Sequence, residues 1–363
     1  MISQDTVRLL VEAARAAPSA DNSQPWQFHC DASRFSCHYR KRDTRDPFGP
    51  AGHATLLSVG AVAENLNQVL GGRIDPVLED LATGAPYFSL FPSAAEVATR
   101  SHPLFRRHTN RFPYQRQPLP RQLSSELAAM TEGSARFILL DGKPELPRFA
   151  DIAEVCCRAR FCNRELHEWL MGSLRWPKEQ PGSGDGLDID TLALPPGGRS
   201  LMRLIRPWKR LEFLNRLGLY RLMAHAEVQA LRHAPLVACI VGDNNKPEGI
   251  FSAGRLMQRA WIMLNDRGWA VHPYYVVADQ YIRSTQGNIP DPWVEPVAAA
   301  LTRLAALLRL NTGEQIHMTL RVGLPTRRAP HSGRMPFDRL ISPGQDLSPP
   351  ASEATPFFVD RAA

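Results

Sequence analysis

Apolar residues recur at helical spacing in the first segment of the chain. Residues 3–17 place five apolar side chains three or four positions apart, on one face of a helix: Val7, Leu10, Val11, Ala14 and Ala17. Pro18 cannot continue a helix, because it lacks the backbone N–H and its ring clashes with the preceding turn. The pattern therefore predicts an amphipathic helix over residues 3–17 and a loop from Pro18 to Pro25.

Two later segments are apolar nearly all round, which is typical of helices buried on every side. They span residues 53–70 and 250–265. The two segments can be aligned with Ser58-x-Gly60 on Ser252-x-Gly254. Because the identity is low, this alignment indicates an internal repeat without proving one.

The remaining pattern predicts a mixed α+β protein. Strand patterns occur in a hairpin at residues 26–39 and at residues 135–140 and 236–241, and a further helix is predicted over residues 123–130. Residues 177–200 are rich in Gly, Pro and Asp without periodicity, which predicts a lid or a disordered segment. The tail at residues 342–363 has the same composition and is expected to be flexible.

Residues 201–223 form a basic stretch with apolar residues at helical spacing, including Leu204, Trp208 and Leu211. Such a pattern can bind a membrane surface. We favour packing beside the lid, over the site described below. With the preceding loop, this stretch makes up a predicted lid insertion at about residues 177–223.

Composition narrows the function classes. The 363 residues carry 43 Lys+Arg against 36 Asp+Glu, without a basic tail, so nucleic acid is not an expected partner. No apolar run is long enough to span a membrane, and the first residues lack the pattern of a signal peptide, so the expected location is the cytoplasm. The six cysteines include no C-x-x-C pair; we expect them to be reduced thiols and expect no metal site.

The loop after the first helix carries the most informative motif. Residues 17–26 read A-P-S-A-D-N-S-Q-P-W. They resemble the A-P-S-x-x-N-x-Q-P-W loop of the nitroreductase superfamily, which lies against bound FMN. The resemblance implies that Pro18, Ser19, Asn22 and Gln24 contact the flavin, and Ser and Asn offer suitable hydrogen bonds. The alternative is a loop that ends a helix beside a buried tryptophan.

A second motif lies at residues 107–112, R-H-T-N-R-F, and is similar to the superfamily's R-x-S-x-R-x-F motif. The resemblance implies that Arg107, His108 and Thr109 lie in the FMN-binding site, with Arg107 and Thr109 on the phosphate. It implies that Arg111 faces the N1/O2 edge of the flavin, where a cation stabilises the charge that appears on reduction. Alone, this motif could equally be a solvated basic loop.

The C-terminal part extends the resemblance. Residues 254–258 and 268–273 are similar to the superfamily's central helix and to the strand after it, which implies that Tyr275 and Val276 approach flavin N5. Residues 321–325 and 332–336 resemble its closing R-x-G-x-P and S-x-R-x-P stretches, which makes Arg334 a third phosphate ligand. Residues 225–229 stand where an Asn/Lys pair is expected, so ligands of the ribityl chain are not assigned.

The two flavin motifs occur in the reverse of the usual order. Ordinary relatives are dimers in which the P-S-x-x-N loop and the arginine motif of one site come from different subunits. Here the first half of the chain carries the P-S-x-x-N loop without an arginine motif, and the second half carries the arginine motif without the loop. We therefore predict a nitroreductase-like α+β fold built as an internal pseudo-dimer, with central buried helices and flanking mixed sheets, most like the Acg-type branch. Residues 1–100 and 101–341 form the two halves, and residues 342–363 form the tail. The same reasoning predicts a monomer with one FMN per chain.

The predicted function is that of an FMN-dependent NAD(P)H oxidoreductase of the nitroreductase type. Hydride would pass from NAD(P)H through flavin N5 to a small acceptor, such as a nitroaromatic compound or a quinone, without a protein acid/base pair. Glu64 and Asn65 on the first central helix are expected to be solvated or supporting groups. One alternative is a flavin-sequestering protein without turnover; a more distant one is a membrane-associated module.

Overall fold

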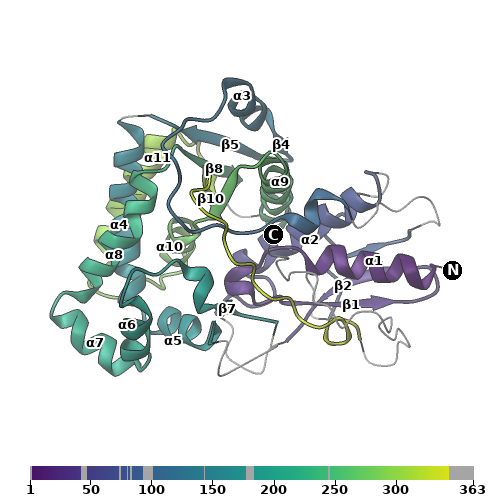
Figure 1. Ribbon diagram of the computed structural model, residues 1–363, viewed down its shortest axis with the longest axis horizontal. Coiled ribbons are helices and arrows are strands. Elements are labelled where there is room, and N and C mark those ends of the chain that lie inside the picture. The colour runs from purple at the N-terminus through teal and green to yellow at the C-terminus, as the bar shows by residue number, and fades with distance from the viewer. Residues whose placement is uncertain are drawn as a thin grey trace.

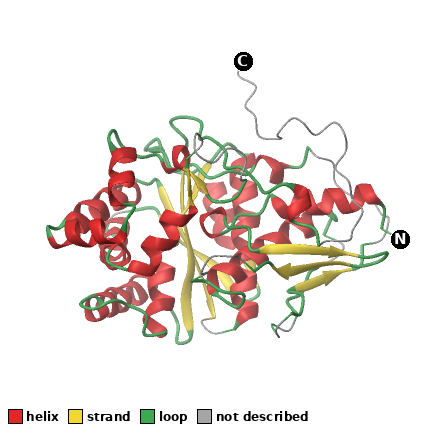
Figure 2. Ribbon diagram, turned by 90° about the horizontal axis from the view of Figure 1, so that it is seen from below, coloured by secondary structure: helices red, strands yellow, loops and turns green. Residues whose placement is uncertain are grey.

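The computed structural model describes residues 2–41, 47–72, 75–79, 81, 84–92, 101–142, 144–176, 184–243 and 246–342. Helices and strands are interspersed along the chain, and the three-stranded and five-stranded sheets lie on different sides of a central pair of helices (Figures 1 and 2). This arrangement confirms the predicted α+β class. Among the described residues, no helix is both long enough and apolar enough to cross a membrane.

The N-terminal elements follow the prediction closely. Helix α1 spans Gln4–Arg15, and Ser3 caps it by accepting a 3.1 Å hydrogen bond at Oγ from the backbone N–H of Thr6. The predicted hairpin is formed by antiparallel strands, to which a third strand adds: β1 (Trp26–Cys30), β2 (Phe35–Tyr39) and β3 (Phe88–Leu90). Between α1 and β1 the chain forms a short 3-10 helix, η1 (Ala20–Asn22).

Helices α2 (His53–Val69) and α9 (Pro247–Asp266) cross at the centre of the fold (Figure 1). A Cβ added to Gly60 would lie 2.1 Å from the carbonyl oxygen of Phe251, and one added to Gly254 would lie 2.1 Å from that of Leu57. The two glycines aligned in the predicted repeat are thus the residues that let the two backbones meet. The internal pseudo-dimer itself stays a prediction.

Two polar residues of α2 decide between the two roles expected of them. Glu64 is 2% exposed and accepts two 2.9 Å hydrogen bonds from Arg259. Asn65 is fully buried, donates a 2.7 Å hydrogen bond to the carbonyl of Ala13 and accepts one of 2.6 Å from Gln258. These side chains join α2 to α9 and α1, so of the two expected roles they have the supporting one and are not solvated.

The larger sheet has five antiparallel strands in the order β4-β5-β8-β10-β9. They span Thr131–Glu132, Ala135–Leu140, Leu236–Asp243, Glu314–Gly323 and Ala270–Pro273 in that order. Alternate residues of β8 face different cores, as strand geometry requires: Ala238 and Ile240 pack towards α9, and Val237 and Cys239 pack towards the helices on the other face. Those helices are α4 (Glu145–Phe161), α8 (Leu219–Arg232), α10 (Val276–Thr285) and α11 (Val294–Leu308). The predicted helix after the arginine motif is α3 (Arg121–Ala129).

The insertion forms a small core of its own. It packs there with α5 (Arg164–Ser173) and β6 (Leu174–Arg175), which precede it in the chain. Its own elements are β7 (Leu187–Asp188), which pairs in parallel with β6, η3 (Ile189–Leu192), α6 (Gly198–Ile205) and α7 (Trp208–Arg216). The single helical pattern predicted over residues 201–223 is divided, since Pro207 and Gly218 separate α6, α7 and α8. Leu204, which that pattern placed on the apolar face, is 49% exposed. Residues 177–183 of the predicted lid lie outside the described residues.

The end of the described chain returns to the first sheet. The backbone N–H of Phe28 on β1 donates a 2.7 Å hydrogen bond to the carbonyl of Leu340, and that of Ser342 donates one of 3.1 Å to the carbonyl of Phe28. Residues more than 300 positions apart therefore lie side by side. The predicted flexible tail, from residue 343 onwards, lies outside the described residues, and the division at residues 100 and 101 stays a prediction.

Cys156 and Cys157 are buried and Cys162 is half-buried, and all three are free thiols. In the described part of the chain no group of three or more His, Cys, Asp or Glu residues could hold a metal ion.

Candidate functional site

The loop between α1 and β1 has an unusual backbone. Asp21, Asn22 and Gln24 adopt φ angles of 47°, 55° and 48°. A residue other than glycine in this left-handed region carries strain, although Asn and Asp tolerate it better than most. Such strain persists only where surrounding contacts fix the backbone, and it gathers at functional sites.

Those contacts come from the side chain of Asn22, which is 6% exposed. Its Nδ2 donates hydrogen bonds of 2.9 Å to the carbonyl of Gly186 and 3.0 Å to that of Gly333, and its Oδ1 accepts one of 2.7 Å from Arg334. The backbone N–H of Gly186 also donates to the carbonyl of Asn22, at 3.1 Å. Asn22 thus joins the loop to the insertion and to the C-terminal segment.

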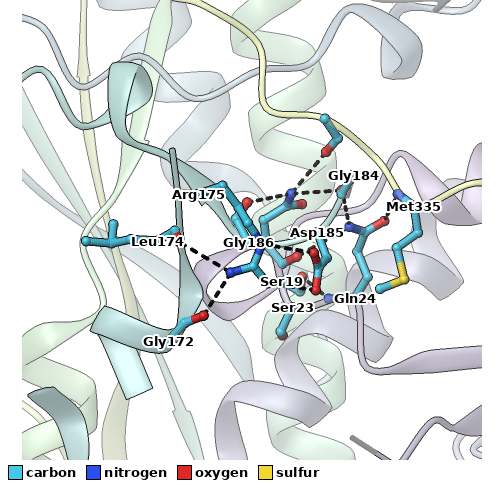
Figure 3. A network of polar contacts seen from close by, with 12 residues as sticks. Ser19, Ser23, Gln24, Gly172, Leu174, Arg175, Gly184, Asp185, Gly186 and Met335 are labelled. Atoms are coloured by element: carbon cyan, nitrogen blue, oxygen red, sulfur yellow. Dashed lines mark hydrogen bonds and ion pairs between the residues drawn. The ribbon is translucent and has the colours of Figure 1, made fainter. Parts of the chain in front are cut away.

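Gln24 is fully buried and continues this network (Figure 3). Its Nε2 donates a 2.9 Å hydrogen bond to the carbonyl of Gly184, and its Oε1 accepts one of 3.0 Å from the backbone N–H of Met335. Ser19 accepts a 2.9 Å hydrogen bond at Oγ from the backbone N–H of Gln24, which closes the loop on itself. Pro18, half-buried, begins the loop. The assignment of these residues as flavin ligands stays a prediction.

Two arginines far apart in the sequence meet beside the loop. Nη2 of Arg107 donates a 3.0 Å hydrogen bond to the carbonyl of Ala16, the C-cap of α1, and Nη2 of Arg334 lies 3.5 Å from the same oxygen. Among the described residues, neither arginine has an ion pair with a carboxylate, and the buried Nε atom of each has no hydrogen-bond partner. The carbonyl at the end of a helix carries only a partial negative charge.

Both guanidinium groups of this pair are buried without a carboxylate partner among the described residues. Arg107 is 4% exposed, and its guanidinium lies 4.3 Å from the ring centroid of Trp261. Burial and then the charge of Arg334 lower the pKa of Arg107 well below its usual value; burial and the charge of Arg15 lower the pKa of Arg334 to about 10. Buried charges are normally paired, so the arrangement favours binding of an anion.

Arg111 lies near Asp21 of the loop. Its Nη1 donates a 3.2 Å hydrogen bond to the carbonyl of Thr191 in the insertion, and Asp21 is close enough to raise its pKa, although burial lowers it more. Asp21 in turn accepts a 2.9 Å hydrogen bond from Nε1 of Trp169. The two ends of the arginine motif therefore lie near Ala16 and near Asp21.

The middle of the motif is fixed through its backbone. Thr109 forms a parallel bridge with Val271, which places the motif beside β9. The backbone N–H of His108 donates a 2.9 Å hydrogen bond to Oδ1 of Asn265, and its carbonyl accepts one of 3.0 Å from Nε1 of Trp261. The imidazole of His108 lies 4.6 Å from that of His331, measured between ring centroids.

The chain beyond β9 leads into α10. Tyr275 is the residue before this helix and Val276 is its first residue, so the first N–H groups of α10 have no partner within the helix. Because β9 runs beside the arginine motif, these amides lie at the end of a strand that borders the site. Their predicted approach to a flavin stays a prediction.

Several residues around the site were not assigned a role from the sequence. Arg321 on β10 is 1% exposed and donates a 2.9 Å hydrogen bond to the carbonyl of Phe112, so it positions the end of the arginine motif. His272 on β9 is buried enough that its pKa falls well below the usual value, with Arg321 and Arg111 adding to the effect. Arg321 begins the R-x-G-x-P stretch and His272 lies in the segment similar to the superfamily's strand, but neither pattern by itself indicated a role at the site.

Comparison of the sequence with family models gives no match. The chain is 28% identical over 284 residues to an uncharacterized protein of Mycobacterium tuberculosis, MT1398, in an alignment that covers 74% of this chain and 39% of that protein. It is 26% identical over 288 residues to PigM of Serratia, a probable NAD(P)H nitroreductase, in an alignment that covers 74% of this chain and 79% of that protein. The chain thus spans well under half the length of MT1398.

Solved structures similar to this chain include two nitroreductases named NfnB. The FMN- and NADPH-dependent enzyme from Sphigopyxis sp. strain HMH is 17% identical, with a TM-score of 0.36, over 68% of this chain and 98% of that chain. The FMN-dependent enzyme from Mycobacterium smegmatis, solved with NADPH, is 14% identical, with a TM-score of 0.34, over 64% of this chain and 93% of that chain.

The relation to PigM agrees with the two loop motifs on which the resemblance was based. It says nothing of a fusion of two halves. The predicted resemblance of this chain to the nitroreductase superfamily is therefore confirmed.

Proposed function

We propose that this chain is an FMN-dependent oxidoreductase that takes hydride from NAD(P)H and passes it to a small acceptor such as a nitroaromatic compound or a quinone. The observation that carries the proposal is the meeting of Arg107 and Arg334 beside the strained loop. Both cations have a buried Nε without a partner, and neither has an ion pair with a carboxylate among the described residues. The phosphate of FMN fits this need, because a dianion pairs with two guanidinium groups through charge-assisted hydrogen bonds.

The flavin would supply the hydride chemistry, and the protein would supply binding, orientation and charge. Arg107 and Arg334 would hold the phosphate, together with Thr109, which belongs to the same motif as Arg107. Arg111, near Asp21 of the loop, would face the N1/O2 edge. Its positive charge is partly desolvated, so it stabilises negative charge there more strongly than an exposed arginine would.

The backbone contributes at two places. The first amides of α10, from Val276, are free of intrahelical partners and are suited to a hydrogen-bond acceptor. Loop residues 18–24 are fixed by Asn22 and Gln24 against the insertion and the C-terminal segment. The side chains of Asn22 and Gln24 therefore shape the loop, while its Pro18 and Ser19 end remains half-buried.

Replacing Arg107 tests the proposal. We expect Arg107→Ala to weaken FMN binding by about 1.5 to 3 kcal/mol, the contribution of a hydrogen bond to a charged group, and to leave riboflavin binding almost unchanged, because riboflavin has no phosphate. Arg106→Ala is the matched control, since Arg106 is exposed and pairs with Asp266 at 2.8 Å. Titration of apo-protein, followed by flavin absorbance, measures both ligands. Equal losses for FMN and riboflavin would remove Arg107 from the phosphate.

The flavin-sequestering alternative rests on the closure of the insertion over the loop, through Gly184 and Gly186. An enzyme and a sequestering protein would bind FMN at the same residues, so affinity does not separate them. Anaerobic addition of NAD(P)H does: bleaching of the bound flavin, followed by recovery of colour with a quinone, supports the enzyme. Persistent colour supports sequestration.

A further inference from the structure

A buried chain of three titratable side chains starts at the segment before α10. The hydroxyl of Tyr275 lies 2.9 Å from Nδ1 of His53, and Nε2 of His53 lies 3.0 Å from Nδ1 of His317. The residues come from three separate elements: the N-cap of α10, the first residue of α2 and the middle of β10. The resemblance to nitroreductases assigned no role to either histidine.

Local structure explains why the two imidazoles meet. The pairing of β10 with β8 shifts register between Ile316 and Met318, so His317 is an extra residue in the strand. A bulge of this kind redirects a side chain. The rings of His53 and His317 stack with an interplanar angle of 11° and centroids 5.2 Å apart, and the two residues are 6% and 0% exposed.

The hydrogen bonds can run in either direction along the chain. In one pattern Tyr275 donates to His53 Nδ1, and His53 Nε2–H donates to His317 Nδ1. In the other, His317 Nδ1–H donates to His53 Nε2, His53 Nδ1–H donates to the oxygen of Tyr275, and the proton of Tyr275 points away from the chain. The second pattern changes to the first when each bond passes one proton onwards.

Burial favours the neutral form of all three side chains. Burial lowers the pKa of His53 well below its usual value, with His317 adding to the effect, and burial lowers that of His317 to about 4 although Asp243 and nearby backbone carbonyls oppose it. Burial raises the pKa of Tyr275, with Asp279 raising it further and Arg283 opposing. A chain of neutral groups at neutral pH can move protons without holding a charge.

The far end of the chain lies towards the edge of the sheet. Nε2 of His317 is buried and has no hydrogen-bond partner among the described residues. Asp243, whose charge acts on His317, is the exposed last residue of β8. Asp243 is thus an exposed acid close enough to the buried end for its charge to act on His317.

We propose that Tyr275, His53 and His317 form a proton relay that delivers a proton from the sheet edge to the acceptor bound in the site. This inference rests on the proposed function. An acceptor that takes a hydride gains two electrons and one proton, and a neutral product needs a second proton. Tyr275 gives that proton from its hydroxyl, His53 Nδ1–H replaces it, His317 Nδ1–H replaces the proton of His53 at Nε2, and His317 takes up one proton at Nε2. Each delivery leaves all three side chains neutral.

Tyr275→Phe tests the relay, with Tyr274→Phe as the matched control. Tyr274 is the adjacent residue and is buried, and its hydroxyl bonds to the sulfur of Cys157 at 2.8 Å instead of to a histidine. We expect Tyr275→Phe to slow reoxidation by a quinone by on the order of 100-fold, the usual contribution of a general acid. Reduction by NAD(P)H needs no proton from the protein, so its rate should fall far less than the rate of reoxidation. Small buffer acids such as imidazolium should restore part of the lost rate, which a purely structural role would not allow.

A second measurement does not require flavin. The 15N chemical shifts of the imidazoles report which nitrogen carries the proton, and loss of the Tyr275 hydroxyl should shift the tautomers of His53 and His317 in the apo-protein, while Tyr274→Phe should not. His53→Gln should slow reoxidation as Tyr275→Phe does. Equal reoxidation rates in Tyr275→Phe and Tyr274→Phe would overturn the relay while FMN binding stands. Failure of the wild-type protein to bind FMN would instead overturn the proposed function, and the relay with it.

Discussion

Asn22 is the side chain on which the candidate site depends most, and its replacement gives a quantitative test. It is a single buried amide in a left-handed backbone conformation with φ of 55°. Asn22→Gly removes the amide and keeps a backbone that glycine adopts without strain. Asn22→Ala removes the same amide and adds a Cβ to a conformation that favours glycine and asparagine.

The expected loss follows from the three strongest hydrogen bonds. The bonds to the carbonyls of Gly186 and Gly333, at 2.9 and 3.0 Å, contribute about 1 kcal/mol each. The 2.7 Å bond from Arg334 involves a charge and contributes about 2 kcal/mol. Asn22→Gly should therefore lower the free energy of unfolding by about 4 kcal/mol, and Asn22→Ala by about 1 kcal/mol more because of the backbone conformation.

Urea unfolding followed by tryptophan fluorescence measures both variants. Asn288→Gly is the control, because Asn288 is exposed and its side chain has only a 3.4 Å contact to Gln286; its free energy should change by less than about 0.5 kcal/mol. FMN affinity should fall in both Asn22 variants, since Arg334 loses the group that holds it beside Arg107. A loss below about 1 kcal/mol, or equal values for the glycine and alanine variants, would refute the reasoning.

Three further predictions address the redox site, the helix crossing and pH. Arg111→Gln should lower the midpoint potential of bound FMN by about 20 mV or more, which corresponds to about 1 kcal/mol for two electrons, with little change in affinity for oxidised FMN. Spectroelectrochemistry measures the potential. An unchanged potential with lost FMN affinity would instead assign Arg111 to the phosphate. Gly254→Ala should destabilise the fold by about 3 kcal/mol or prevent folding, because the added Cβ would lie 2.1 Å from a backbone carbonyl oxygen. Gly172→Ala is the control, because a Cβ added there meets nothing within 4 Å. Thermal unfolding compares the two variants. His317 has a pKa of about 4 in the folded chain against 6.5 for an exposed histidine, so between these values the unfolded chain binds one more proton than the folded chain. The free energy of unfolding should therefore fall as pH decreases from about 6.5 towards 4, by up to about 1.4 kcal/mol per pH unit. His317→Gln should reduce this dependence when urea unfolding at pH 7 is compared with unfolding at pH 5.

The sequence predicted the parts of the fold whose signal is local. Helices α1, α2 and α9 follow from hydrophobic spacing, and the β1–β2 hairpin from alternation between turn residues. The alignment of Gly60 with Gly254 came from a weak repeat, and the structure shows the physical reason for both glycines at the crossing of α2 and α9. The loop motif located the candidate site because its residues are contiguous in the sequence, so its signal is also local.

The remaining features depend on contacts between distant segments. The ion pairs of Glu64 join α2 to α9, and a carboxylate on an apolar helix gives no sign of its partner 195 positions away. His317 is brought to His53 by a bulge, which shifts the register of one strand pair and leaves no mark in the periodicity of β10. The break at Pro207 and Gly218 could have been found, because both residues interrupt helices, yet the apolar spacing of the stretch concealed it.

The strain in the loop and the burial of two arginines are two parts of the same arrangement. Asn22 in its left-handed conformation directs its amide towards Gly186, Gly333 and Arg334, so the backbone strain is offset by contacts that also hold one of the cations. Those contacts come from the insertion and from the C-terminal segment, and Gly333 and Arg334 follow both sheets and both central helices in the sequence. The loop alone therefore cannot adopt its site conformation, and a chain truncated before Gly333 should lose the fixed loop and the second cation together. An anion placed between the two guanidinium groups would relieve the remaining cost of burying them, which is why the arrangement is better explained as a binding site than as a structural feature.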